Sequence, residues 1–168
     1  MAARIICHEL RIPKNKFNAV KIALIRISKR IAEKEINVEE KLIDLLKRSS
    51  ISIQTKIAVV ISRKELGIKA ISFARSGGHT TYIVEENEAK KIKKEWGVKS
   101  IRENLNLITI RSSEELEEVP GVIAFLLNAL AYEGINIVEF ISCYTDTLLV
   151  VKEADTHKAY EVLSAIMK

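Results

Sequence analysis

The spacing of apolar side chains in residues 117–140, EEVPGVIAFLLNALAYEGINIVEF, predicts a helix followed by a strand. One apolar face recurs at three- and four-residue intervals, as in an amphipathic helix, through Val122, Leu126, Ala129 and Leu130. Pro120 suits the first helical turn, where its missing N–H is no loss, and Gly134 suits the left-handed position that closes a helix. After Gly134 the apolar period shortens to two, which is typical of a strand. The two ends of this helix are therefore the positions to examine for function.

The N-terminal 50 residues read as mainly helical. A short strand is predicted over residues 3–7, and apolar residues at helical spacing predict an amphipathic helix over residues 17–34. Asn37 fits an N-cap of a second helix, because acidic residues follow it at once and basic residues close the segment NVEEKLIDLLKRSS.

Residues 51–100 change to strand-like patterns. The segments IQTKIAVVIS, IKAISFARS and TTYIVEE predict three strands, with a glycine turn SGGH joining the last two, and NEAKKIKKEWG predicts a helix. Residues 101–168 repeat this order with an extra helix after their first strand, and the β-α-β-β-α order is nearly a ferredoxin-like unit. We interpret the first copy as a repeat without that helix, and an N-terminal helix is a candidate to occupy the vacant place on the sheet.

Charge divides the chain near residue 100. Residues 1–100 contain 22 Lys and Arg against 11 Asp and Glu, whereas residues 101–168 contain 5 against 11. Together with the change from helical to strand-like patterns near residue 50, this divides the chain into residues 1–50, 51–100 and 101–168. The basic half is either a solvated surface or a contact surface for nucleic acid or an acidic partner.

Composition excludes several classes of protein. With 48% hydrophobic and 29% charged residues, the chain is expected to be globular and soluble, and no apolar run reaches the length of a membrane span. Two scattered cysteines argue against a disulfide framework and for a reducing cytoplasm. No cysteine or histidine pair has metal-ligand spacing, and no nucleophile motif is present. We expect no catalytic residues, no metal and no cofactor.

The start of the helix at Pro120–Gly121 carries the one candidate for binding chemistry. The first turn of a helix presents unpaired N–H groups and partial positive charge, which suit a carboxylate. Gly121 has no side chain there to obstruct a small ligand. The same residues also suit a plain helix start in which glycine serves packing, and the residues alone leave both interpretations open.

The string VPGVIAFLLNALAYEGINIVEFISCYTDTLLVV resembles the ACT domain, the small-molecule-sensing module of amino-acid metabolism. The resemblance rests on Pro120-Gly121-Val122, on Gly134-Ile135-Asn136-Ile137 and on the strand TDTLLVV. It is similar to the regulatory tails of aspartate kinases, which carry two ACT units, but the chain has no kinase domain. The resemblance covers residues 105–168 well, residues 53–100 weakly and residues 1–50 not clearly.

This resemblance implies an α+β fold: a helical N-terminal segment, a degenerate ACT-like unit and a C-terminal ferredoxin-like βαββαβ ACT unit. It also implies pairing of ACT units into a homodimer or higher oligomer, with an amino acid bound where one unit meets another. Carried onto this sequence, the ligand-binding residues are Glu118, Pro120, Gly121, Val122, Asn136 and Ile137. The family often has Asp or Asn two residues before the Pro-Gly pair, where this chain has Glu118.

The sequence therefore predicts a non-enzymatic, cytoplasmic regulator that binds an amino acid or similar small metabolite and no membrane. The alternative is a transcriptional regulator in which the basic residues 1–100 contact nucleic acid while the ACT unit senses an effector. That alternative predicts nucleic-acid affinity that falls steeply with salt. The sequence does not identify the effector or the regulated target.

Overall fold

A computed structural model describes residues 2–13 and 16–168, with the backbone alone for residue 3 and residues 31–38. The chain divides into two compact units, residues 1–41 and residues 42–168. These bounds differ from the predicted division at residues 50 and 100, and residue 100 lies inside a strand. The larger unit contains every strand of the described chain.

The N-terminal unit is helical, with α1 (Ala2–Glu9) followed by the first part of α2 (Phe17–Lys47). The strand predicted over residues 3–7 is wrong, because Ile6 and Cys7 are half-buried on one side of α1 while Ile5 is exposed. The two predicted helices are one helix of 31 residues that continues through Asn37. No glycine or proline interrupts residues 17–47, so the helix continues past Asn37 despite the N-cap signal there.

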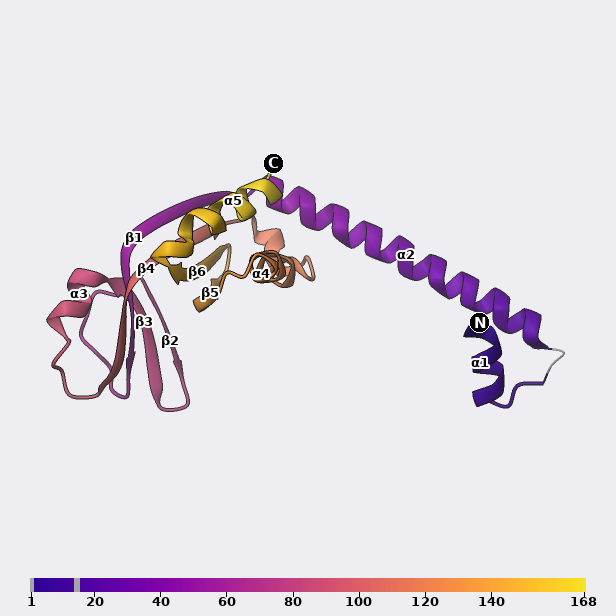
Figure 1. Cartoon of the computed structure of the whole chain (residues 1–168), viewed down its shortest axis with the longest axis horizontal. Coiled ribbons are helices and arrows are strands. Elements are labelled where there is room, and N and C mark those ends of the chain that lie inside the picture. Colours follow the sequence, from indigo (N-terminus) through magenta and orange to yellow (C-terminus); the bar gives the residue numbers. More distant parts are fainter. Residues whose placement is uncertain (1, 14–15) are drawn as a thin grey trace. The chain divides into compact units, whose positions relative to one another are not determined.

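Residues 42–168 form a six-stranded antiparallel sheet with the strand order β2-β3-β1-β4-β6-β5 (Figure 1). The strands in chain order are β1 (Ser50–Ser62), β2 (Ser72–Ser76), β3 (His79–Glu85), β4 (Val98–Arg111), β5 (Ile137–Cys143) and β6 (Asp146–Lys152). The helices are α3 (Glu86–Lys91), α4 (Val122–Tyr132) and α5 (Thr156–Ile166), with short 3₁₀ turns η2 (Glu114–Glu117) and η3 (Glu153–Asp155).

The two long central strands serve both halves of the sheet. Residues 50–54 of β1 pair with residues 107–111 of β4, beside β6 and β5, whereas residues 57–62 of β1 pair with residues 98–105 of β4, beside β3 and β2. The half of the sheet that contains β5 and β6 therefore takes its fourth strand from β1. The half that contains β2 and β3 takes its fourth strand from β4. This exchange gives the expected α+β architecture of one complete and one degenerate ACT-like unit.

Both long strands bend where they pass from one half to the other (Figure 1). Lys56 and Asn104 have positive φ angles of 59°, and the β1–β4 register shifts between Gln54 and Ile57. Such bulges add an unpaired residue and sharpen the local twist of a strand. The bend follows from these two bulges.

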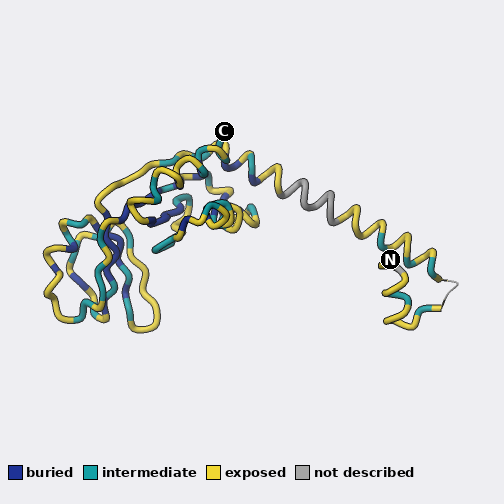
Figure 2. The backbone as a smooth tube through the Cα atoms, viewed as in Figure 1, coloured by how far each residue is buried: buried dark blue, intermediate teal, exposed yellow. Residues whose placement is uncertain are grey.

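Three apolar clusters stabilise the larger unit, and Figure 2 shows the buried residues gathered along its strands. One cluster lies under α4 and α5, and another lies under α3 in the first half of the sheet. The third lies on the opposite face, because its strand residues alternate with those of the other two clusters. Through Leu105 at the bend, it joins Ile57, Val59 and Ile83 of the first half to Leu107, Leu148 and Val150 of the second half. Since these residues are at most 7% exposed and no helix contributes to the cluster, the two bent halves cover one another there.

The vacant helix position of the first half is not filled by an N-terminal helix, so that expectation is wrong. The connection between β1 and β2 packs there instead, through Leu66, Ile68 and Ala70. The last turns of α2 pack in the other half, where Leu42, Leu45 and Leu46 join the cluster under α4 and α5. The end of α2 is thus part of the core under α4 and α5.

Candidate functional site

The start of α4 is open to solvent. Glu118, Pro120 and Gly121 are exposed, whereas the Val122 side chain is buried in the core with 1% exposure. Pro120 precedes the helix rather than lying in its first turn, because Gly121 is the N-cap with a left-handed φ of 89°. No side chain caps the helix, and no atom lies within 4 Å of the place a Gly121 side chain would occupy. A small ligand can therefore approach the first-turn N–H groups.

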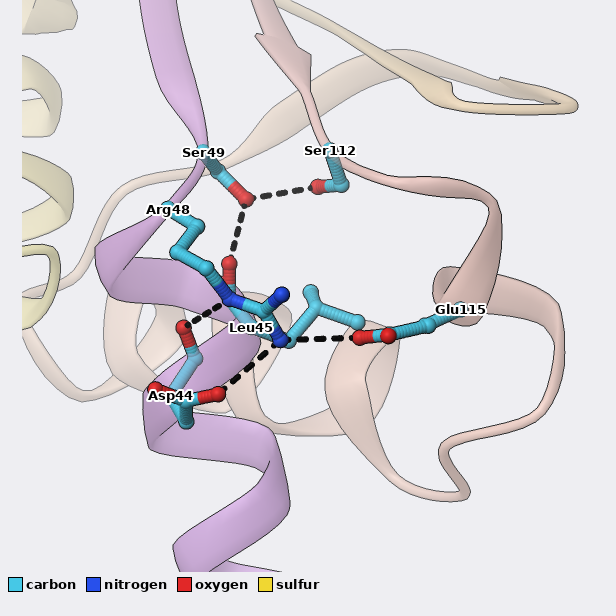
Figure 3. A network of polar contacts seen from close by, with 6 residues as sticks. All are labelled: Asp44, Leu45, Arg48, Ser49, Ser112 and Glu115. Atoms are coloured by element: carbon cyan, nitrogen blue, oxygen red, sulfur yellow. Dashed lines mark hydrogen bonds and ion pairs between the residues drawn. The ribbon is translucent and has the colours of Figure 1, made fainter.

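The acidic loop before α4 is attached to the end of α2 (Figure 3). The Arg48 guanidinium lies 2.8 Å from a Glu115 carboxylate oxygen and 2.9 Å from an Asp44 carboxylate oxygen. The Ser49 hydroxyl lies 2.9 Å from the Ser112 hydroxyl and donates to the carbonyl of Leu45. The residues of this network lie on separate elements that the core already holds together. The network therefore fixes one end of the acidic loop.

Other charged groups of this region are on the ends of neighbouring strands. Arg111 and Asp146 face each other across β4 and β6 and form two hydrogen bonds of 2.9 and 3.0 Å. These hydrogen bonds and the charge of Arg111 hold the pKa of the Asp146 carboxyl below its usual range. The hydrogen bond to Glu114 raises the pKa of Tyr144, and burial and the charge of Glu117 add to that effect.

The other end of α4 closes as predicted. Gly134 has a φ of 73°, its N–H donates to the carbonyl of Ala131, and the N–H of Ile135 donates to the carbonyl of Leu130. This pair of hydrogen bonds is the Schellman motif, which requires a left-handed residue at the position of Gly134. The chain then continues through the exposed Asn136 into β5.

The predicted site residues therefore lie in two groups. Glu118, Pro120, Gly121 and Val122 surround the start of α4, whereas Asn136 and Ile137 follow its end. An α-helix of 11 residues spans about 16 Å, so the two groups are not adjacent within one copy of the chain. Ile137 packs against the core under α4 and α5.

Asn136 lines a different feature, a cleft of about 860 Å³ at the bend of the sheet. Its walls combine cationic, acidic, amide and apolar side chains from β4, from the start of β5 and the residue before it, and from the end of β6 and η3: Arg102, Glu103, Asn104, Leu105, Asn136, Val138, Lys152, Glu153 and Ala154. Sequence reasoning identified only Asn136 among these residues. The cleft depends on the bulge at Asn104, for which the sequence carries no glycine signal.

Strand register places the two cations of the cleft on the face that carries the shared apolar cluster. Lys152 pairs with Leu105, and Arg102 pairs with Val59, and both partners belong to that cluster. Directly paired residues in antiparallel strands project to the same side of a sheet. The cations therefore flank an apolar floor that includes Leu105.

Hydrogen bonds hold the walls of the cleft in place. The backbone N–H of Asn104 donates to the Glu86 carboxylate at 3.1 Å, which ties the bulge to the start of α3. The amide of Asn106, 5% exposed, donates to the Thr156 hydroxyl at 2.9 Å, and this hydroxyl donates to the carbonyl of Lys152. The turn that carries Glu153 and Ala154 is thereby anchored to β4.

The charged side chains of the cleft differ in whether they form ion pairs. Glu103 forms an ion pair with Lys93 at 3.7 Å. Within the described part of the chain, Arg102, Lys152 and Glu153 form no ion pair. The cleft therefore offers two positive groups and one negative group for interaction with a ligand.

Within residues 2–13 and 16–168, which the structure describes, no cluster of three His, Cys, Asp or Glu residues could hold a metal ion. Within the same residues, no helix combines the length and apolarity needed to cross a membrane.

Residues 100–165 match the family model described as the ACT domain. This part of the chain is an ACT domain. The predicted resemblance is thus confirmed for the segment that contains α4, Asn136 and the second half of the sheet. No curated protein sequence matches the chain.

Solved structures share the fold of the ACT domain and of the unit before it. An aspartate kinase from Clostridium acetobutylicum has 15% identity and a TM-score of 0.59 over 71% of this chain, which spans 34% of that kinase. The ligand-free regulatory subunit of aspartate kinase from Thermus thermophilus has 13% identity and a TM-score of 0.58, and the match covers 70% of this chain and 96% of that subunit. A Vibrio cholerae protein described as of unknown function, possibly in transport, has 18% identity and a TM-score of 0.61, with coverages of 78% and 99%.

Proposed function

We propose that this protein is a non-catalytic, cytoplasmic regulator whose ACT domain binds an amino acid or similar small metabolite at an oligomer interface. The observation that carries the proposal is the ACT domain over residues 100–165, joined to a second ACT-like unit as in a protein named as a regulatory subunit of aspartate kinase. Free cysteines at positions 7 and 143 agree with a reducing compartment.

The start of α4 supports this role chemically. A ligand carboxylate meets the free N–H groups beside Gly121 and Val122, and the ligand ammonium meets Glu118. Asn136 lies about 16 Å away at the other end of α4, so a ligand that contacts both groups needs Asn136 from a second copy. The proposed site and the proposed oligomer are in this way parts of one arrangement.

We expect at least one of the twenty amino acids to stabilise the protein at millimolar concentration. A ligand that binds only the folded state raises its stability according to the ratio of ligand concentration to Kd. A thermal-shift screen followed by calorimetry measures this effect. If no amino acid raises the melting temperature, the proposal of an amino-acid sensor falls.

A substitution at Gly121 tests the position of the site, but the left-handed backbone limits which residues can replace glycine there. Valine at this position would strain the backbone, because β-branched residues are disfavoured at a φ of 89°. Gly121→Asn is the better variant, since Asn tolerates left-handed backbone and its side chain would enter the open space. Asn136→Ala is the companion change at the other end of α4, and weaker effector binding is expected from both variants.

Exposed edges and aromatic residues support self-association. β2 and β5 are the edge strands of the sheet, and exposed edges commonly pair with another chain unless they are protected. Phe125, Tyr132 and Tyr160 are exposed on α4 and α5 of the ACT domain. We expect sedimentation equilibrium at micromolar concentration to give a dimer or larger species, and a single species of 18.9 kDa would contradict it.

Nucleic-acid binding stays the alternative proposal. It rests on the excess of cations in residues 1–100, and a gel shift at low salt distinguishes it from a regulator that binds only small molecules.

A further inference from the structure

We infer that the cleft at the bend of β4 binds an acidic amino acid, aspartate or glutamate, with Arg102, Lys152 and Glu153 as its charged contacts. The inference rests on the proposed regulatory role and places a further binding site apart from the start of α4. It also assigns the chemical class of its ligand.

Charge complementarity carries the inference. Arg102 and Lys152 line the cleft without an ion-pair partner among the described residues, and Glu153 is the unpaired acid beside them. Glu103 is already occupied by Lys93. Two free cations and one free carboxylate match the two carboxylates and one ammonium of an acidic amino acid. A neutral amino acid would leave one of the cations without a partner.

The remaining walls suit the rest of such a ligand. Leu105 and Val138 belong to or pack against the shared apolar cluster, and they offer contact to the ligand methylene groups. The side-chain amides of Asn104 and Asn136 can donate to a carboxylate or accept from an ammonium. Small-ligand sites are commonly clefts of about 300–1,000 Å³ with a few convergent polar groups, and this cleft lies within that range.

The walls are also held in place before a ligand arrives. The Asn104 N–H is bound by Glu86, and the Lys152 carbonyl is bound by Thr156, which is in turn held by Asn106. Fixed walls reduce the ordering that binding requires. A ligand in this cleft contacts both β4 at its bend and the end of β6.

Calorimetry on the full-length protein tests the assignment with L-aspartate and L-glutamate, and with L-asparagine and L-glutamine as neutral analogues of the same shape. We expect the acid to bind about tenfold or more tightly than its amide, since loss of one charged hydrogen bond has an effect of this order. Arg102→Ala and Lys152→Ala should each weaken binding of the acid by a similar factor. Both residues are exposed, and circular dichroism with a melting curve verifies that each variant is folded.

Lys99→Ala is the matched control, because Lys99 is an exposed cation of the same strand that does not line the cleft. It should leave the Kd of the acid unchanged. Binding of the amides as tightly as of the acids, or binding of the acid that Arg102→Ala and Lys152→Ala leave unchanged, overturns the inference and leaves the proposed function standing. Absence of binding by all twenty amino acids overturns both.

Discussion

Leu46→Ala is expected to lower the free energy of unfolding of residues 42–168 by about 2–5 kcal/mol, the cost of a large cavity in a packed core. Leu46 is 0% exposed and packs in the cluster under α4 and α5, although it belongs to the last turn of α2. Its loss therefore acts on the ACT domain itself. Urea unfolding followed by circular dichroism measures the change.

Ile27→Ala is the control for this prediction, since it lies in the same helix with 53% of its surface exposed. An exposed substitution of this kind is expected to change stability by no more than about 0.5 kcal/mol. Equal effects of Leu46→Ala and Ile27→Ala would contradict the placement of the end of α2 in the core.

Ile83→Ala is the second substitution with a large expected effect, again about 2–5 kcal/mol. Ile83 lies on β3 in the first half of the sheet and is 0% exposed in the apolar cluster that both halves share. Because residues of β4 and β6 complete that cluster, the cavity should destabilise the ACT domain as well as the first half. Hydrogen exchange of backbone amides reports the opening free energy of each element separately.

The expected result is faster exchange in α4 and α5, which belong to the second half, as well as in β3. Ile53→Ala provides the matched control, since Ile53 lies on β1 outside the three clusters and is 40% exposed. If Ile83→Ala accelerates exchange only in β2, β3 and α3, the two halves are energetically independent and the shared cluster does not couple them.

The link between the end of α2 and the acidic loop lies beside the proposed effector site at the start of α4. Arg48 and Ser49 follow α2 directly and contact Glu115 and Ser112, which lie before the Pro120–Gly121 turn.

Elements whose signals are local were predictable from the sequence. The helix α4, its closure at Gly134 and the strand after it follow from apolar spacing and from a glycine that can adopt a left-handed backbone. The ACT resemblance followed from the same segment, because the family's pattern includes both ends of this helix. The N-terminal elements were less well predicted: α1 was expected as a strand, since a short apolar segment such as residues 3–7 does not distinguish the two periods.

Some features were decided only by the tertiary structure, because they depend on contacts between residues far apart in the chain. The sequence by itself determined the order of strands and helices over residues 51–168, the ACT-like repeat and the candidate residues at the two ends of α4. It did not determine that β1 and β4 each serve two units, because strand pairing over about 50 residues leaves no local pattern. Nor did it reveal the cleft at the bend, whose walls come from three separate segments that only the bulge at Asn104 and the pairing of β4 with β6 bring together. Local periodicity specifies the elements, whereas burial between distant elements specifies which of their faces meet.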